Sequence, residues 1–194
     1  MGVIGCGGIF RSLHAPYYEV TDRARIVAVA DVREENARQA AERFGADPYT
    51  DYRELLARDD VDGVDVCVHP RPHREICVAA ARAGKHILVE KPMCVNVAEA
   101  DAMIQAAREA NVRLQVAYMQ RWNPAYQKLK ELLEDGTLGR PFLVYGVEIG
   151  WFPPTHPWLF KKEESGGMMI EQAIHTVDAW VLALRAGGPR LCRG

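Results

Sequence analysis

Short apolar runs alternate with amphipathic helical patterns along the first 118 residues. The run at 26–30 (IVAVA) is continuous, which is typical of a strand buried on both faces of a parallel sheet. Gly45 stands where a helix C-cap glycine belongs, and Asn96 is expected to cap a helix that extends to about residue 110. This alternation predicts right-handed strand–helix–strand units, and therefore an α/β fold with a Rossmann doubly wound parallel sheet. The predicted strands cover residues 1–4, 26–30, 64–68, 86–90 and 113–118, and the other predicted helices cover residues 33–44 and 76–83.

The pattern changes near residue 120. Asn123 and Pro124 predict the start of a helix, a strand is expected over residues 142–149, and a further helix is expected from about residue 168. A single strand has no partners for its hydrogen-bond ladder, so this second domain is expected to be incomplete. We therefore predict a Rossmann domain over residues 1–120 and the start of an α+β domain, truncated, over residues 121–194.

Composition and charge narrow the functional classes. Apolar residues make up 48% and charged residues 26% of the chain, which is the balance of a globular protein. A formal net charge of −2 without a basic cluster argues against nucleic-acid binding. No apolar stretch is long enough to span a membrane, and no export signal is recognisable. The five cysteines are scattered without a CxxC pair, which favours reduced thiols and a cytoplasmic location.

A glycine-rich turn follows the first predicted strand. Gly5 and Gly7 occupy the first two positions of the GxGxxG pattern, but Phe10 stands at the third. Such a turn lets backbone N–H groups approach a pyrophosphate at the start of a helix. Gly5, Gly7, Gly8, Ile9 and Phe10 are therefore candidate cofactor-binding residues, with an ordinary tight turn as the alternative.

An acid after the second predicted strand strengthens the first interpretation. Asp31 stands where this fold places the carboxylate that binds the adenosine ribose hydroxyls. A carboxylate there repels a 2′-phosphate, so NAD is favoured over NADP. Arg33 keeps NADP open because it could accept the phosphate, and a solvated or helix-capping Asp31 is the remaining alternative.

Four separated segments carry a family resemblance. They are residues 4–16 (IGCGGIFRSLHAP), 83–92 (AGKHILVEKP), 120–126 (QRWNPAY) and 165–178 (SGGMMIEQAIHTVD). Together with residues 31–45 they make the chain resemble the Gfo/Idh/MocA oxidoreductases over nearly all of its length up to about residue 180.

The resemblance implies an N-terminal Rossmann domain and a C-terminal domain with a large, mostly antiparallel sheet. It implies a nicotinamide cofactor and a sugar, cyclitol or related polyol substrate. It also implies that Lys91 works near the reacting hydroxyl, that Glu171 and His175 have roles in the site, and that Pro70 and His73 lie on a loop passing the nicotinamide ribose. The family usually has Asp where this chain has Glu171.

Oxidation of an alcohol needs a proton acceptor besides the cofactor, and Lys91 and His175 are the candidates. Lys91 could polarise the substrate oxygen, or it could simply pair with Glu90, which is itself a cofactor-side candidate. Glu171, His175 and Asp178 are spaced to share one helical stripe, where two carboxylates would make the histidine more basic. A solvated polar helix face is the alternative.

Several further residues are weaker candidates. Arg121 at the domain junction could line the substrate cleft or cap a helix, and Trp151 and Trp158 could stack on a sugar or pack in a core. A metal site at Cys67, His69 and His73 is not expected, because no fourth ligand follows at a zinc-like spacing.

The sequence therefore predicts an NAD(P)-dependent dehydrogenase acting on a sugar or polyol. A truncated or non-redox member is the alternative: an inactive NAD-binding remnant, a sugar-sensing regulator or an NAD-dependent glycosidase. A homo-oligomer stays open if the second domain is complete.

Overall fold

The computed structural model describes residues 1–147 and 157–186, and its centre is a six-stranded parallel sheet with the order β3-β2-β1-β4-β5-β6. This is the strand order of the dinucleotide-binding doubly wound fold, and it confirms the predicted fold class. The order reverses between β1 and β4, which places a ligand crevice outside the carboxyl ends of these strands. The strands are β1 (Gly2–Ile4), β2 (Ala28–Ala30), β3 (Asp47–Tyr49), β4 (Gly63–Val66), β5 (His86–Val89) and β6 (Leu114–Val116).

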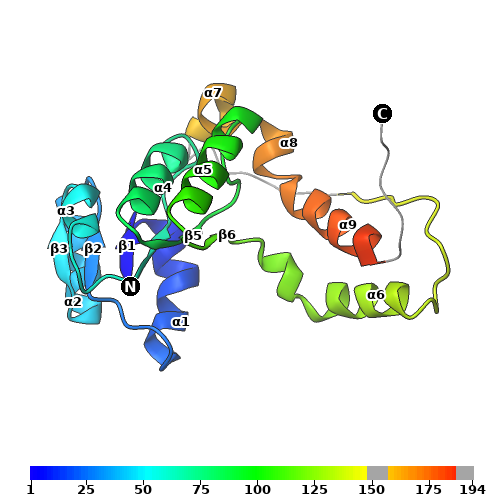
Figure 1. Cartoon of the computed structure of the whole chain (residues 1–194), viewed down its shortest axis with the longest axis horizontal. Coiled ribbons are helices and arrows are strands. Elements are labelled where there is room, and N and C mark those ends of the chain that lie inside the picture. Colours follow the sequence, from blue (N-terminus) through cyan, green and yellow to red (C-terminus); the bar gives the residue numbers. More distant parts are fainter. Residues whose placement is uncertain (148–156, 187–194) are drawn as a thin grey trace.

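Helices cover both faces of the sheet (Figure 1). Val64 and Val66 of β4 pack on one face with α3, α4 and α5, whereas Val3 of β1 and Cys67 pack on the other with η1, α1 and α2. The bounds are η1 (Phe10–His14, a π-helical turn), α1 (Ala15–Val20), α2 (Glu34–Phe44), α3 (Tyr52–Leu56), α4 (His73–Arg82) and α5 (Val97–Glu109).

Two predicted helix ends are confirmed. Gly45 ends α2 in the left-handed conformation, with φ 63° and ψ 38°, which a residue without a Cβ adopts at little cost. Asn96 begins α5 by accepting a hydrogen bond from the Glu99 N–H at 3.0 Å. Local sequence signals therefore set where these helices begin and end.

The edge strand β3 and helix α3 were not predicted from the sequence. β3 consists of Asp47, Pro48 and Tyr49 and is mostly exposed, so it carries no apolar run that would reveal it. Proline is tolerated there because an edge strand leaves part of its ladder unpaired. Asp51 caps α3 by accepting from the Arg53 N–H.

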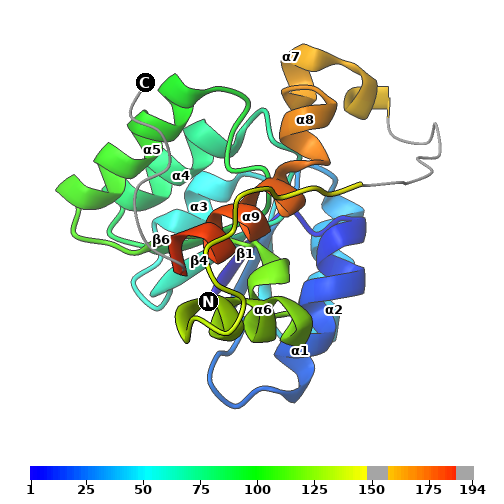
Figure 2. The same ribbon diagram turned by 90° about the vertical axis from the view of Figure 1, so that its right-hand side faces the viewer.

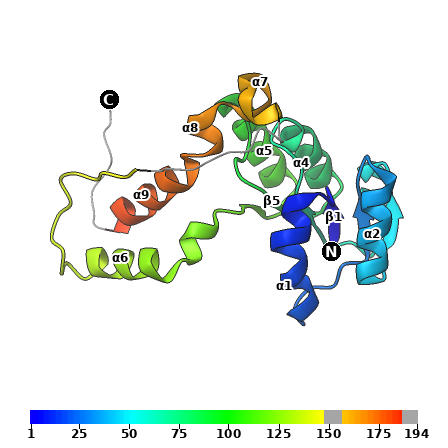
Figure 3. The ribbon, with the colours of Figure 1, turned by 180° about the vertical axis from the view of Figure 1, so that it is seen from behind.

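A second region follows β6. Its helices α6 and α9 lie side by side at one end of the molecule (Figures 1 and 3), and Figure 2 views the molecule from that end, with both helices in front of the sheet. The bounds are η2 (Met119–Trp122), α6 (Pro124–Glu134), η3 (Pro157–Phe160), α7 (Lys162–Ser165), α8 (Met168–Glu171) and α9 (Ile174–Ala186).

The strand predicted over residues 142–149 is wrong for residues 142–147, which form no regular element; residues 148 and 149 lie outside the described part of the chain. Apolar residues alternate along this segment, but no strand of the described structure lies beside it to supply hydrogen-bond partners. Instead Gly146 passes against α9, and a Cβ there would lie 2.8 Å from the Trp180 ring.

No helix within residues 1–147 and 157–186 is long and apolar enough to cross a membrane.

Candidate active site

The glycine turn lies at the carboxyl end of β1. Gly5 has φ +94°, and a Cβ on it would lie 2.7 Å from Val68 Cγ1 and 2.8 Å from the Cys67 carbonyl carbon, so only glycine fits. A Cβ on Gly7 or Gly8 would meet nothing within 4 Å. The outer side of the turn is therefore open, and the helical backbone that starts there offers N–H groups that suit a pyrophosphate.

Phe10 takes a different place from the one predicted. Its side chain is fully buried and its ring centroid lies 5.9 Å from that of Phe44, so it packs between η1 and α2 rather than facing a cofactor. This packing explains why the third glycine of the pattern is dispensable here, since Phe10 fills the space between the two helices. Ile9, the preceding residue, is 48% exposed and stays a candidate.

Asp31 is fixed beside the glycine turn. Its Oδ2 accepts from the Cys6 N–H at 2.8 Å and from Asn36 Nδ2 at 3.3 Å, and its Oδ1 accepts from the Arg33 N–H at 2.8 Å. The carboxylate therefore joins the turn to the start of α2, at the place where a ribose would lie in this fold. Arg33 itself is exposed.

Lys91 and Glu171 meet across the two regions. Lys91 follows β5, and its Nζ donates to Glu171 Oε1 at 2.8 Å and to the Glu171 carbonyl oxygen at 2.9 Å. The two side chains are 18% and 6% exposed. A charge-assisted bond with this little exposure holds the Lys91 side chain in a defined position. The structure thus brings together two of the three predicted catalytic residues.

The helix predicted from residue 168 is interrupted. α8 ends at Glu171, and Ala173 N–H donates to the Met168 carbonyl oxygen at 3.2 Å, which is the wide turn that closes many helix C-termini. α9 starts at Ile174. Glu171, His175 and Asp178 therefore do not share one continuous stripe as expected. His175 lies partly buried in the first turn of α9.

The Asp178 carboxylate is held by Arg121. Arg121 Nε donates to Asp178 Oδ2 at 2.8 Å and its Nη2 to Oδ1 at 2.6 Å, a bidentate pair in which Asp178 is 8% exposed. The Arg121 guanidinium also lies 5.4 Å from the centroid of the Tyr118 ring. About half of the Arg121 side chain, 48%, stays exposed.

Trp158 lies beside the loop that leaves β4. Its ring centroid is 6.0 Å from that of His69, and His69 Nε2 is 3.8 Å from Glu164 Oε2. Arg71 Nη1 also donates to the Glu163 carbonyl oxygen at 3.4 Å. The segment around η3 and α7 therefore rests on the edge of the sheet where the glycine turn lies. Trp151 lies outside the described residues.

His73 is a correction to the predicted cofactor contacts. It is fully buried, with Nδ1 3.0 Å from the Pro92 carbonyl oxygen and Nε2 3.1 Å from that of Val68. Burial lowers its pKa, against the effect of these carbonyls. The ring braces two loops against each other and is not accessible to a ligand. Pro70, on the same loop, is also buried.

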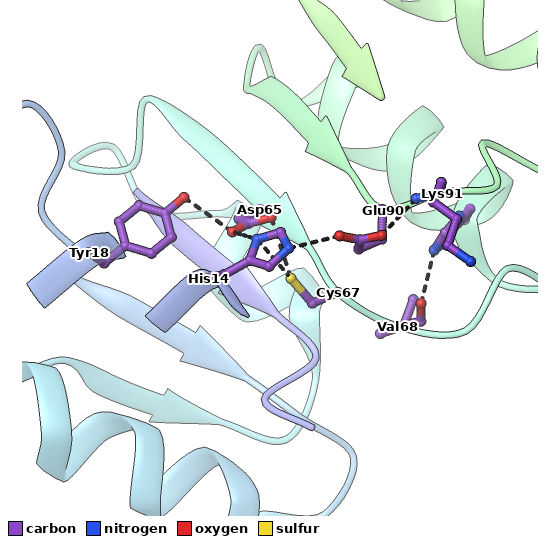
Figure 4. Close-up of polar contacts among 8 residues, drawn as sticks. His14, Tyr18, Asp65, Cys67, Val68, Glu90 and Lys91 are labelled. Carbon is purple, nitrogen blue, oxygen red and sulfur yellow. Dashed lines mark hydrogen bonds and ion pairs between the residues drawn. The ribbon is translucent and has the colours of Figure 1, made fainter. Parts of the chain in front are cut away.

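A buried polar network that was not predicted from the sequence lies under the crevice (Figure 4). His14 Nδ1 lies 2.8 Å from Asp65 Oδ2, and His14 Nε2 lies 2.8 Å from Glu90 Oε1. Tyr18 OH donates to Asp65 Oδ2 at 3.1 Å, and Glu90 Oε2 accepts from the Lys91 N–H at 2.9 Å. Asp65 was the available signal, because an acid inside an apolar strand must find a partner.

Cys67 contacts the same network. Its Sγ lies 3.6 Å from His14 Nδ1 and 3.4 Å from Asp65 Oδ1, and the three donor atoms lie within 4.8 Å of one another. Burial, and next the Asp65 charge, hold the pKa of this thiol well above its ordinary value. Because His14 and Asp65 already bond each other, we interpret the group as an ion-pair network with a neutral thiol.

Two family models match the chain. One, described as an oxidoreductase family with an NAD-binding Rossmann fold, matches residues 1–118; the other, the GFO/IDH/MocA C-terminal domain, matches residues 126–187. The chain is 36% identical to a myo-inositol 2-dehydrogenase of Thermotoga maritima over 92% of its own length and 52% of that protein. It is 31% identical to a 1,5-anhydro-D-fructose reductase of Ensifer adhaerens, over 91% and 54% respectively.

Solved structures of dehydrogenases are also similar to the chain. A probable dehydrogenase from Thermotoga maritima superposes with a TM-score of 0.81 at 31% identity, covering 95% of this chain and 54% of that one. The WlbA dehydrogenase of Bordetella pertussis, solved with NADH and UDP-GlcNAcA, gives 0.83 at 29% identity, covering 94% and 58%. The chain spans about half the length of the curated relatives it matches.

Proposed function

The chain belongs to the Gfo/Idh/MocA family of oxidoreductases, and we propose that it transfers a hydride between a nicotinamide cofactor and a secondary alcohol of a sugar, cyclitol or related polyol. The observation that carries the proposal is the Lys91–Glu171 pair at the carboxyl end of β5. It puts a fixed ammonium in the crevice where this fold binds its ligands. We also propose residues 1–120 as the cofactor-binding unit and residues 121–194 as belonging to the substrate-binding unit.

The proposed roles follow from the chemistry of alcohol oxidation. When bound, the nicotinamide supplies the hydride acceptor. Lys91 donates a hydrogen bond to the substrate oxygen, and Glu171 keeps the ammonium oriented. His175 accepts the hydroxyl proton as the carbonyl forms, because a neutral imidazole is basic enough near neutral pH. Arg121 and Trp158 lie on the second region and are proposed to contact the substrate hydroxyls and ring.

The residues of the first region fit a dinucleotide. The open outer side of Gly7 and Gly8 leaves room for a pyrophosphate, and the fixed Asp31 carboxylate can accept from ribose hydroxyls. We propose NAD as the preferred cofactor, because the Asp31 charge repels a 2′-phosphate. An Asp31→Asn variant keeps the shape of the side chain and an oxygen that can accept from the Cys6 N–H, so its affinities for NADH and NADPH, measured by fluorescence titration, test the charge. We expect weaker NADH binding and stronger NADPH binding; an unchanged ratio contradicts the preference.

Hydride transfer is tested directly with deuterated substrate. The chain is incubated with NAD and a panel of polyols that includes myo-inositol carrying deuterium at each carbinol carbon, and reduced cofactor is followed by absorbance and proton NMR. We expect NADD from one substrate class. The proposed function is wrong if the chain binds NADH but forms no reduced cofactor from NAD with any member of the panel.

A further inference from the structure

Asp65 is a fully buried acid in the middle of an apolar strand. Its neighbours Val64 and Val66 face α3–α5, while Asp65 faces η1 and α1. Burying an unpaired carboxylate is very costly, so this position demands a cation. His14 supplies it at 2.8 Å, from the π-helical turn that follows the glycine turn.

The geometry fits His14 as an imidazolium between two carboxylates. Both ring nitrogens face carboxylate oxygens at 2.8 Å, Asp65 on one side and Glu90 on the other. A neutral imidazole has a single N–H and could donate to only one of them. Burial lowers the pKa of His14, but the hydrogen bonds and charges of Asp65 and Glu90 outweigh it and raise the pKa to about 10. The other groups facing the ring, Cys67 and Tyr18 beside Asp65, both have raised pKa values and stay neutral.

The second contact of His14 decides what Glu90 can do. Glu90 Oε1 is taken by His14 Nε2, and Glu90 Oε2 is taken by the backbone N–H of Lys91. Lys91 thus has two carboxylates in its neighbourhood, and its ammonium pairs with Glu171 across the crevice. Figure 4 shows the line of contacts from Tyr18 through Asp65, His14 and Glu90 to Lys91.

We infer that His14 is a positioning residue: it occupies Glu90 and so prevents this carboxylate from capturing the Lys91 ammonium, which stays directed at Glu171 and the substrate. The inference rests on the proposed function for its kinetic consequence, but the choice of carboxylate is a structural property of the chain. The contact of His14 with Glu90 also links the glycine turn to Lys91, because His14 is the last residue of η1, the helical segment that follows this turn.

The central test combines His14→Gln with Glu90→Gln. We expect His14→Gln to lower kcat by about 10²-fold, since misplacement of a reacting group by an ångström costs about that much. In the double variant the neutral amide at position 90 no longer attracts Lys91, so kcat should return to within about threefold of Glu90→Gln alone. A role limited to stability gives no such rescue, and additive losses overturn the inference. His86→Gln is the matched control, because His86 lies at the other end of β5 and accepts from the Arg113 N–H.

Two measurements do not depend on turnover. Crystal structures of His14→Gln and of the double variant are expected to show Lys91 Nζ on Glu90 in the first and on Glu171 in the second. Imidazole ¹⁵N shifts are expected to show His14 protonated through pH 8, and a lowered pKa in Asp65→Asn. An intact Lys91–Glu171 pair in His14→Gln, or a neutral His14 at pH 7, overturns the inference. Absent turnover in a chain that passes both measurements counts instead against the proposed function.

Discussion

The two regions of this molecule are held together by different forces. Within residues 1–118 two clusters of buried apolar side chains cover both faces of the sheet. In residues 119–147 and 157–182, by contrast, the buried apolar side chains are Leu133 and Ala179, and Phe142 and Tyr145 are 99% and 83% exposed.

Polar contacts join the second region to the first. Lys91 bonds Glu171, His69 faces Glu164, and Arg71 donates to the Glu163 carbonyl oxygen. The proposed cofactor-binding surface is therefore set by a packed core, whereas the Lys91–Glu171 pair is set by a few charged contacts. Substitutions in the packed core should therefore act mainly on stability, and substitutions in the Lys91–Glu171 pair mainly on catalysis.

The largest expected effect is the loss of the reacting ammonium. Under the proposed function, Lys91→Ala should lower kcat/KM by about 10²–10³-fold, because the hydrogen bond that polarises the substrate oxygen is lost. The affinity for NADH should stay within a few-fold, since the glycine turn and Asp31 are untouched. Steady-state kinetics and fluorescence titration measure the two. Lys128→Ala on the exposed face of α6 is the control. Equal losses of binding and turnover would contradict the division of roles between Lys91 and the glycine turn.

Core truncation tests the difference in packing. Leu55→Ala, in the fully buried core of the first region, should lower the free energy of unfolding by about 2–5 kcal/mol. Leu133→Ala in α6 should cost near the lower end, about 2 kcal/mol, because its surroundings are exposed and can relax. Urea unfolding followed by circular dichroism measures both. An equal or larger loss at Leu133 shows that the second region has a core of its own.

Gly5 and Gly139 both have a positive φ, but they differ in how closely other atoms approach the position of a Cβ. At Gly5 a Cβ would meet backbone at 2.8 Å, whereas at Gly139, with φ +65°, it would meet nothing within 4 Å. Gly5→Ala should therefore cost about 2–4 kcal/mol, from strain plus overpacking, and should weaken NADH binding. Gly139→Ala should cost about 1 kcal/mol, from backbone strain alone. Thermal unfolding with and without NADH separates the effects, and similar costs at the two sites would refute the argument.

The smallest expected effect concerns the pair inside the second region. Asp178→Asn removes the charge that Arg121 binds on two oxygens, and it should lower stability by about 1–2 kcal/mol, since Arg121 is half exposed and solvent screens the pair. Arg140→Ala, at an exposed position, should leave stability unchanged. A double-mutant cycle with Arg121→Ala measures the coupling free energy between the two residues. A coupling free energy of zero means that the pair does not stabilise α9.

Local signals in the sequence were enough for most of the first region. The apolar runs predicted five of the six strands, and Gly45 and Asn96 marked helix ends, because these features depend on a residue and its near neighbours. β3 escaped prediction because an exposed edge strand needs no apolar run. The failure at residues 142–147 has the opposite cause: apolar alternation was present, but a strand also requires a partner that the sequence pattern does not reveal.

The site was predicted in part for the same reason. Lys91, Glu171 and Asp31 lie at strand ends or in quoted motifs, so their neighbourhood could be expected from the fold. The place of Phe10 could not, because it depends on Phe44, 34 positions along the chain. Asp65 was visible as an acid in an apolar strand, but its partner His14 lies 51 residues away, and only the fold brings them together.

The Lys91–Glu171 contact also links ligand occupancy to the arrangement of the two regions. Two of the three N–H groups of the Lys91 ammonium bond Glu171, so the third can bond a substrate oxygen while α8 stays in contact with the end of β5. Thermodynamic reciprocity then requires that a substrate bound more tightly because Glu171 orients Lys91 also holds α8 on β5 more firmly, by the same factor. Under the proposed function, the ion pair couples interdomain contact to catalysis, and its strength becomes a quantity on which selection can act.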